Sequence, residues 1–166
     1  MTNSGLHHVG LATHNMEATL DFYENILGFK TRVCDVIQPA TGGAIRHAFL
    51  DTGDGEMIAF MEFNEVPGIE TNFDAGINRG LGLGGGVMHF AFKAADEADL
   101  EVKKNHLLNH DVATRGIVDH GWCKSIYFTD PNGLQLEYCV VTEVLDDTHV
   151  ADKKSEVWMK YAKSNG

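Results

Sequence analysis

Two histidines and one glutamate have the residue types and the positions of a metal-binding set. His8 lies in the run LHHVGLAT, His89 in VMHFAFK and Glu137 in LQLEYC. Each run alternates in the way that half-buried strands do. Two imidazoles and one carboxylate, with coordination positions left free, are the ligands of a facial triad for a divalent metal. Because a carboxylate buried on a sheet is costly unless it is paired or metal-bound, the set predicts a metal site.

The alternative is that these side chains are structural or face solvent, as isolated strand histidines and glutamates usually do. The alternation argues against it. Val9 and Leu11 share one face of the first run, which leaves His8 on the other face beside a glycine. His89 lies beside Ala91 in the same way. Three such residues at matching places of a repeat favour the metal site.

The elements that must position these residues form two copies of one β-α-β-β-β pattern. The first copy has a helix that Asn15 caps and Gly28 closes, and the second has a helix over 96–110. The strands expected in the first copy are 6–13, 30–38 (weakly marked), 44–50 and 56–63. Those expected in the second copy are 87–93, 112–118, 123–129 and 134–141. His8 and His89 occupy equivalent positions.

We therefore expect one α+β domain over residues 1–166. Its parts are module 1 at about 5–63, a glycine-rich connection at 64–86, module 2 at about 87–141, and a C-terminal tail at 142–166. The connection is either a mobile linker or a loop over a site. The tail is expected to carry a short helix at about 151–163.

Composition and charge exclude several classes of protein. With 43% hydrophobic residues the chain can bury a core, and no apolar stretch approaches the length of a transmembrane helix. The net charge of −11 argues against a nucleic-acid surface and gives no sign of a preference for anionic substrates. Three cysteines without metal-site spacing, and a start without a secretory pattern, predict a cytoplasmic protein.

The chain resembles the vicinal oxygen chelate superfamily of glyoxalase I, bleomycin and fosfomycin resistance proteins, methylmalonyl-CoA epimerase and type I extradiol dioxygenases. The resemblance lies in LHHVGL, DFYENILGF, HFAF and YFTDPNGLQLE, all within residues 6–140. It implies paired βαβββ modules that form an open, barrel-like mixed sheet around a metal. It carries over His8, His89 and Glu137 as ligands of one divalent ion, with Fe(II) favoured and Mn(II), Zn(II) or Ni(II) as alternatives.

The first module differs from the second at the ligand position. When residues 58–60 (IAF) of the first copy are aligned with residues 136–138 (LEY) of the second, Ala59 takes the position of Glu137. Glyoxalase I and the epimerase resemble each other in using a fourth protein ligand there. A methyl group leaves an additional position open, which favours extradiol cleavage, where Fe(II) binds a catecholate and then O₂ beside it. Glu62 is expected on the opposite face of its strand.

A second local match concerns the segment DHGWCKSIYF, which resembles the part of extradiol enzymes where a histidine and a tyrosine flank the substrate. It implies that His120 binds substrate or acts in acid–base steps, and that Tyr127 hydrogen-bonds a substrate oxygen. The alternatives are a surface-loop histidine and a core tyrosine. His47 is a further candidate for a substrate contact, but its place matches the family poorly. Such enzymes also commonly carry four modules, whereas this chain has two.

Three classes of function follow. The first is a non-haem Fe(II) extradiol-type dioxygenase that acts on a small catecholic or vicinal-oxygen substrate. The second is a glyoxalase-like lyase or isomerase, or a fosfomycin-type transferase, that uses the metal as a Lewis acid. The third is a bleomycin-resistance-like protein that sequesters a ligand and needs no metal triad. The expected partners are a small molecule and a second copy of the chain, because the modules expose sheet edges, and neither nucleic acid nor membrane is expected.

Overall fold

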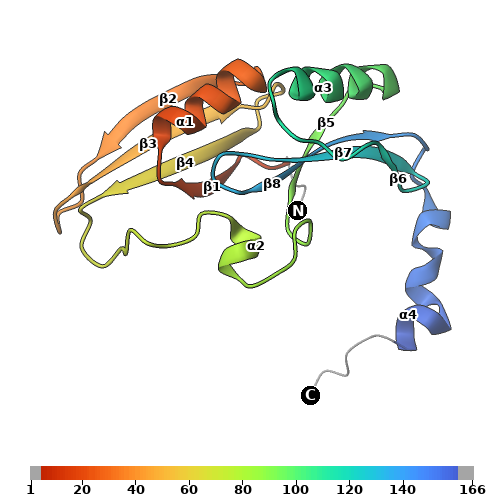
Figure 1. Ribbon diagram of the computed structural model, residues 1–166. Coiled ribbons are helices and arrows are strands. Elements are labelled where there is room, and N and C mark those ends of the chain that lie inside the picture. Colours follow the sequence, from red (N-terminus) through yellow and green to blue (C-terminus); the bar gives the residue numbers. More distant parts are fainter. Residues whose placement is uncertain (1–4, 161–166) are drawn as a thin grey trace.

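The computed structural model describes residues 5–160, which form two four-stranded mixed sheets with α1 and α3 on one side (Figure 1). The first sheet, in the order β1-β4-β3-β2, contains β1 (His8–Thr13), β2 (Lys30–Ile37), β3 (Ala44–Asp51) and β4 (Met57–Asn64). The second, in the order β5-β8-β7-β6, contains β5 (Phe90–Lys93), β6 (Val118–Asp119), β7 (Cys123–Thr129) and β8 (Gln135–Val141). In each sheet the module's first and last strands pair in parallel, and the other pairs are antiparallel. The predicted α+β fold of two βαβββ modules is confirmed.

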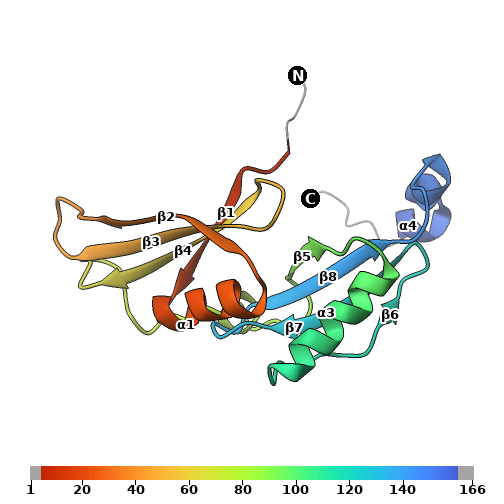
Figure 2. The ribbon, with the colours of Figure 1, turned by 90° about the horizontal axis from the view of Figure 1, so that it is seen from above.

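The two sheets lie side by side and are not closed into one barrel (Figure 2). The module helices are α1 (Met16–Asp21) with the π-helical turn η1 (Phe22–Ile26), and α3 (Glu97–Asn109). The sequence predicted one uninterrupted helix up to Gly28, but its second half is wider, since the Leu27 amide bonds to the Phe22 carbonyl. The wider turn accompanies the burial of two consecutive aromatic side chains, Phe22 and Tyr23.

Two strands are shorter than the sequence predicted. Of the strand expected at 112–118, only Val118 and the residue after it pair with β7. The strand expected to start at 87 begins at Phe90, because the side-chain amide of Asn78 bonds to both backbone groups of Met88, at 2.7 and 2.8 Å. His89 therefore immediately precedes β5.

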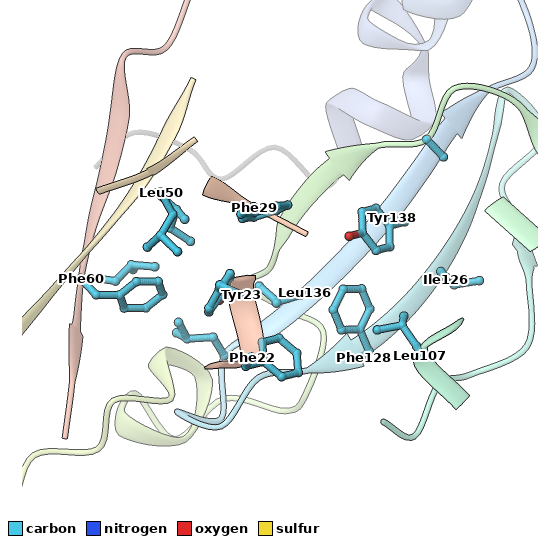
Figure 3. Close-up of a cluster of buried hydrophobic side chains, with 14 of the residues drawn as sticks. Phe22, Tyr23, Phe29, Leu50, Phe60, Leu107, Ile126, Phe128, Leu136 and Tyr138 are labelled. Atoms are coloured by element: carbon cyan, nitrogen blue, oxygen red, sulfur yellow. The ribbon is translucent and has the colours of Figure 1, made fainter. Parts of the chain in front are cut away.

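The two modules share one hydrophobic core, in which aromatic side chains from both meet (Figure 3). Phe29 of the first module packs edge-to-face on Phe92 of the second, with ring centroids 5.0 Å apart. The fully buried Tyr23 donates a hydrogen bond of 3.1 Å to Asp130, in the turn between β7 and β8. Burial raises the pKa of Asp130, and its hydrogen bonds oppose that rise. The motifs YENILGF and DPNG thus join the modules.

The remaining helices lie in the connection and the tail. The connection contains α2 (Ile77–Gly80), and the tail contains a 3₁₀ helix, η2 (Asp147–Lys154), and α4 (Glu156–Lys160), which project from the body (Figure 1). The last residues of the helix expected at 151–163 lie outside the described part of the chain. Within residues 5–160 there is no helix with the length and apolarity needed to span a membrane.

Candidate metal and substrate site

Strand register sets which residues share a position in the two modules. In the second module Ala91 pairs with Glu137 across β5 and β8. In the first, Gly10 pairs with Ala59 across β1 and β4. Because Gly10 and Ala91 each lie two residues after their module's histidine, Ala59 is the structural counterpart of Glu137. The neighbouring strand places Tyr127 opposite Glu137 and, equivalently, a phenylalanine opposite Ala59.

The second module brings Glu137 and His89 together. The Glu137 side chain is buried, with 5% of its surface exposed, and its Oε2 lies 2.9 Å from Nε2 of His89. Its other oxygen accepts a hydrogen bond from the hydroxyl of Ser125. On the far side of the imidazole, Nδ1 donates to the carbonyl of Gly86 at 3.1 Å. We call this arrangement the Glu137–His89 pair.

This pair fits a divalent metal in its chemistry. A metal-ligating histidine typically donates its second ring nitrogen to a carbonyl or carboxylate, as Nδ1 of His89 does. Donation from Nδ1 leaves Nε2 as the nitrogen that faces the carboxylate, in the position where a metal would be bound by both. The hydroxyl of Ser125 and the carbonyl of Gly86 are therefore in the positions of outer groups that hold the two ligands in orientation.

Tyr127 and His120 lie beside the Glu137–His89 pair. The Tyr127 ring stands edge-to-face with the His89 ring, with centroids 5.8 Å apart, and its hydroxyl lies 3.0 Å from Nε2 of His120. Burial and the neighbouring carboxylate of Glu137 raise the pKa of the Tyr127 phenol. The phenol therefore stays protonated near neutral pH and keeps its hydrogen as a donor. Four of the predicted site residues thus form one cluster.

A pocket of about 650 Å³ opens at Tyr127 and His120, and its size is typical of sites for small molecules. Its other lining residues are Gly85, Gly86, Val87, Ala113, Thr114, Arg115, Val118, Phe128, Thr129 and Gln135. The end of the glycine-rich connection therefore lines the pocket. Of the two interpretations of this connection, a loop over a site fits that end better than a mobile linker. Residues 113–115, which were expected to be a strand, form another wall.

The first module carries the remaining histidine ligand candidate on its own sheet. His8 is exposed on β1, with its ring edge-to-face on Phe49 at 5.1 Å and its Nδ1 2.7 Å from that of His7. His47 also packs on Phe49, with ring centroids 4.4 Å apart, and its Nδ1 is 3.5 Å from the carboxylate of Asp35. Among residues 5–160, no three histidine, cysteine, aspartate or glutamate side chains gather into a metal-holding group. Within one chain, His8 does not join the Glu137–His89 pair.

The face of β4 that carries Ala59 has no carboxylate ligand. Ala59 is buried, with 1% of its surface exposed. Glu62 lies on the opposite face, as predicted, where it accepts a hydrogen bond from the Met16 amide and pairs with Arg46. It therefore serves the first turn of α1 and does not replace a metal ligand.

Sequence reasoning missed three residues that hold the site in shape. Ser125 could have been found, because it lies two residues before Tyr127 on a regular strand and so shares its face. Asn78 and Gly86 had no local signal. Both act through contacts with residues several positions away in an irregular segment, where side-chain direction has no fixed period.

Comparisons with known proteins agree with this architecture. The model of the "Glyoxalase/Bleomycin resistance protein/Dioxygenase superfamily" matches residues 5–138. The protein named "Putative ring-cleaving dioxygenase MhqA" from Bacillus subtilis (strain 168) is 29% identical over 136 residues, which cover 80% of this chain. They cover 38% of that protein, so the chain spans well under half the length of this relative.

Two solved structures have the same fold as this chain. A glyoxylase/bleomycin resistance protein/dioxygenase domain from Frankia sp. EAN1pec superimposes with a TM-score of 0.65 at 21% identity, over 84% of this chain and 99% of that one. The fosfomycin resistance protein FosX from Listeria monocytogenes gives a TM-score of 0.60 at 18% identity, over 85% and 96%. Both match nearly their full length, so two modules of this kind make up the whole of these solved chains.

Proposed function

Because the chain belongs to the Glyoxalase/Bleomycin resistance protein/Dioxygenase superfamily, we propose that it is a divalent-metal-dependent enzyme of the extradiol ring-cleaving type. The observation that carries the proposal is the contact of the buried Glu137 with the exposed His89, with Tyr127 and His120 beside this pair at a pocket. The name of the MhqA relative supports the same reaction class. The proposed substrate is a small catechol or another molecule with vicinal oxygens, and the proposed metal is Fe(II).

In this proposal His8, His89 and Glu137 hold the metal. Bound Fe(II) would supply Lewis acidity that favours the deprotonated diol, together with the redox capacity for reaction with O₂. The chain's own contribution is to fix the ligands. Ser125 keeps the Glu137 carboxylate in one orientation, and the Gly86 carbonyl fixes the tautomer of His89.

Tyr127 and His120 would act on the substrate. The protonated phenol of Tyr127 can donate a hydrogen bond to a substrate oxygen, and its ring covers the side of His89. The proton that a diol loses on binding can pass to the phenol oxygen while the phenol hydrogen moves to Nε2 of His120, 3.0 Å away, and the reverse transfer returns it later. The pocket beyond these two residues would take the ring and its substituents.

Ala59 supports ring cleavage over the classes that use a fourth protein ligand. At the counterpart of Glu137 it offers a methyl group and no donor atom, which leaves room for both a chelating diol and O₂. The second candidate is a fosfomycin-type transferase, because that resemblance also implies two histidines and one glutamate. Oxygen dependence separates the two candidates, since only the first consumes O₂.

We infer that the metal site is completed between two copies of the chain. His8 lies on the open face of one sheet and the Glu137–His89 pair on the other, and they do not meet within residues 5–160. If the first sheet of one copy faced the second sheet of its partner, each dimer would contain two complete sites. Sedimentation should then give a dimer mass, and a monomer mass at all concentrations would refute this arrangement.

Mixed dimers test that arrangement directly. His8→Ala and Glu137→Ala chains, co-expressed with different tags, should form a heterodimer in which one site is intact and the other lacks both ligands. We expect about half of the wild-type metal content in the purified heterodimer and almost none in either variant homodimer. A heterodimer as metal-poor as the homodimers would show that each site uses ligands from a single chain.

The activity itself is tested with protein purified without oxygen and loaded with Fe(II). A panel of catechols should give O₂ uptake together with the absorbance of a ring-opened product. Zn(II)-loaded protein is the matched control, because it retains Lewis acidity but has no accessible redox change. Stoichiometric Fe(II) without O₂ uptake on any catechol would contradict the ring-cleaving assignment and leave the transferase as the candidate to test.

A further inference from the structure

One of the chain's four arginines stands apart from the others in its surroundings. Arg32 pairs with Asp51, Arg46 pairs with two glutamates, and Arg79 pairs with Asp74. Arg115 has no carboxylate partner among the described residues. A guanidinium without a partner is unusual in a chain with 24 acidic side chains, so its location is informative.

Arg115 lines the pocket next to the proposed metal site. Its backbone amide donates to the Tyr127 carbonyl at 3.2 Å, which fixes this part of the wall against β7. None of the described residues that line the pocket is an aspartate or a glutamate, whereas three of them, Thr114, Tyr127 and Thr129, carry hydroxyl groups. The protein has a net charge of −11, but the lining of this pocket contains the cationic Arg115 and no carboxylate. An anionic ligand would therefore meet a positive charge here and no like charge.

We propose that Arg115 binds an anionic group of the substrate, so that the substrate class is an aromatic vicinal diol with a carboxylate-bearing side chain. This inference rests on the proposed function for the diol half of the molecule. A guanidinium matches a carboxylate with two parallel hydrogen bonds, and Tyr127 both contacts His89 and lines the pocket together with Arg115. The volume of about 650 Å³ accommodates one substituted ring.

The test is equilibrium binding by calorimetry to the Zn(II)-loaded protein, which does not turn over. The probes are 3,4-dihydroxyphenylacetate, which carries the carboxylate, and 4-methylcatechol, which does not. Arg115→Gln should weaken binding of the first by about 10- to 100-fold and leave the second nearly unchanged. Arg115→Lys should recover part of the loss, because it keeps the charge but not the two-pronged geometry. Lys30→Gln, on β2 of the other sheet, is the control for the same change in net charge.

A third probe, phenylacetate, separates this inference from the proposed function. If phenylacetate binds and depends on Arg115 while neither catechol shows metal-dependent binding, the anion site stands and the ring-cleaving proposal fails. If both catechols bind equally well and Arg115→Gln weakens neither, the anion site is refuted and the proposed function stands. Unchanged binding of 4-methylcatechol to Arg115→Gln also shows that the variant is folded.

Discussion

The two modules place a histidine and an aromatic ring in the same relation, but they differ in what stands next to them. The Phe49 ring meets His8 edge-to-face at 5.1 Å, and the Tyr127 ring meets His89 edge-to-face at 5.8 Å. In the second module the aromatic residue is Tyr127, which has a hydroxyl group. The residue opposite it on the neighbouring strand is Glu137. In the first, both of those polar groups are absent. A duplicated frame thus carries one of the proposed metal ligands in one copy and two in the other.

The comparison extends to the preceding residue on the same face of each strand. His47 precedes Phe49 by two residues, as Ser125 precedes Tyr127, so the two are counterparts. Ser125 donates to the buried carboxylate of Glu137, whereas His47 contacts Phe49 and faces Asp35. With no carboxylate to orient in its own module, His47 is available to contact a substrate, as the sequence suggested. That role stays a prediction.

Removal of a proposed ligand should have the largest effect. His8→Ala, His89→Ala and Glu137→Ala should each lower metal affinity by more than about 100-fold, because even outer groups that orient ligands cost 10- to 100-fold. Metal content after dialysis would measure the loss of metal, and circular dichroism would show whether the fold is retained. Glu62→Gln, on the opposite face of β4, is the matched control. Unchanged affinity in any of the three variants would remove that residue from the site.

Ala59→Glu makes the first module resemble the second and should abolish oxygen chemistry. Gly10 lies opposite Ala59, and the nearest atom to a Cβ added at Gly10 is the flexible end of the Met61 side chain, 3.9 Å away. Metal affinity should hold or rise with another hard oxygen donor, while O₂ consumption falls by at least about 100-fold, because too few open positions remain.

Ala59→Leu controls for the added volume without a donor atom. If spectroscopy shows the new carboxylate on the metal and O₂ consumption is undiminished, the extradiol assignment is wrong. Weakened metal binding by Ala59→Glu, with the fold intact, would show that position 59 does not face the metal.

Ser125→Ala should have an intermediate effect. The change leaves the buried Glu137 carboxylate with one hydrogen-bond partner fewer, so we expect metal affinity to fall by about 10-fold, measured by competition with a chelator. Thr129→Val, on the same strand and the same face, removes a hydroxyl of the pocket as a control. Equal affinities for Ser125→Ala and the wild type would show that Ser125 does not orient the ligand.

Tyr127→Phe makes the second module resemble the first and should have the smallest effect on metal affinity. The edge-to-face contact with His89 is kept and only the hydroxyl is lost, so metal affinity should stay unchanged while kcat falls by about 10-fold. Phe49→Tyr is the reverse control and should leave kcat within about a factor of two. A Tyr127→Phe enzyme with full kcat would assign the hydroxyl a structural role only.

Alternation in the sequence was enough to assign His8 and Glu137 to one face of their strands. Side chains alternate along a strand with a period of two, so Val9 and Leu11 placed His8 on the open face, and LQLEYC placed Glu137 opposite the apolar side chains. The repeat also aligned Ala59 with Glu137, because parallel pairing of the first and last strands follows the same register in both modules.

Which of these faces meet depends on how the modules pack and could not be predicted from local patterns. The separation of His8 from the Glu137–His89 pair depends on how the modules pack, through contacts such as Tyr23 with Asp130, and no local period encodes that. The pocket wall at Arg115 likewise arises where the chain makes one backbone bond to Tyr127 before it enters the sheet at β6. Alternation is a local property of extended backbone, whereas distances between remote residues are set by the packing of the whole core.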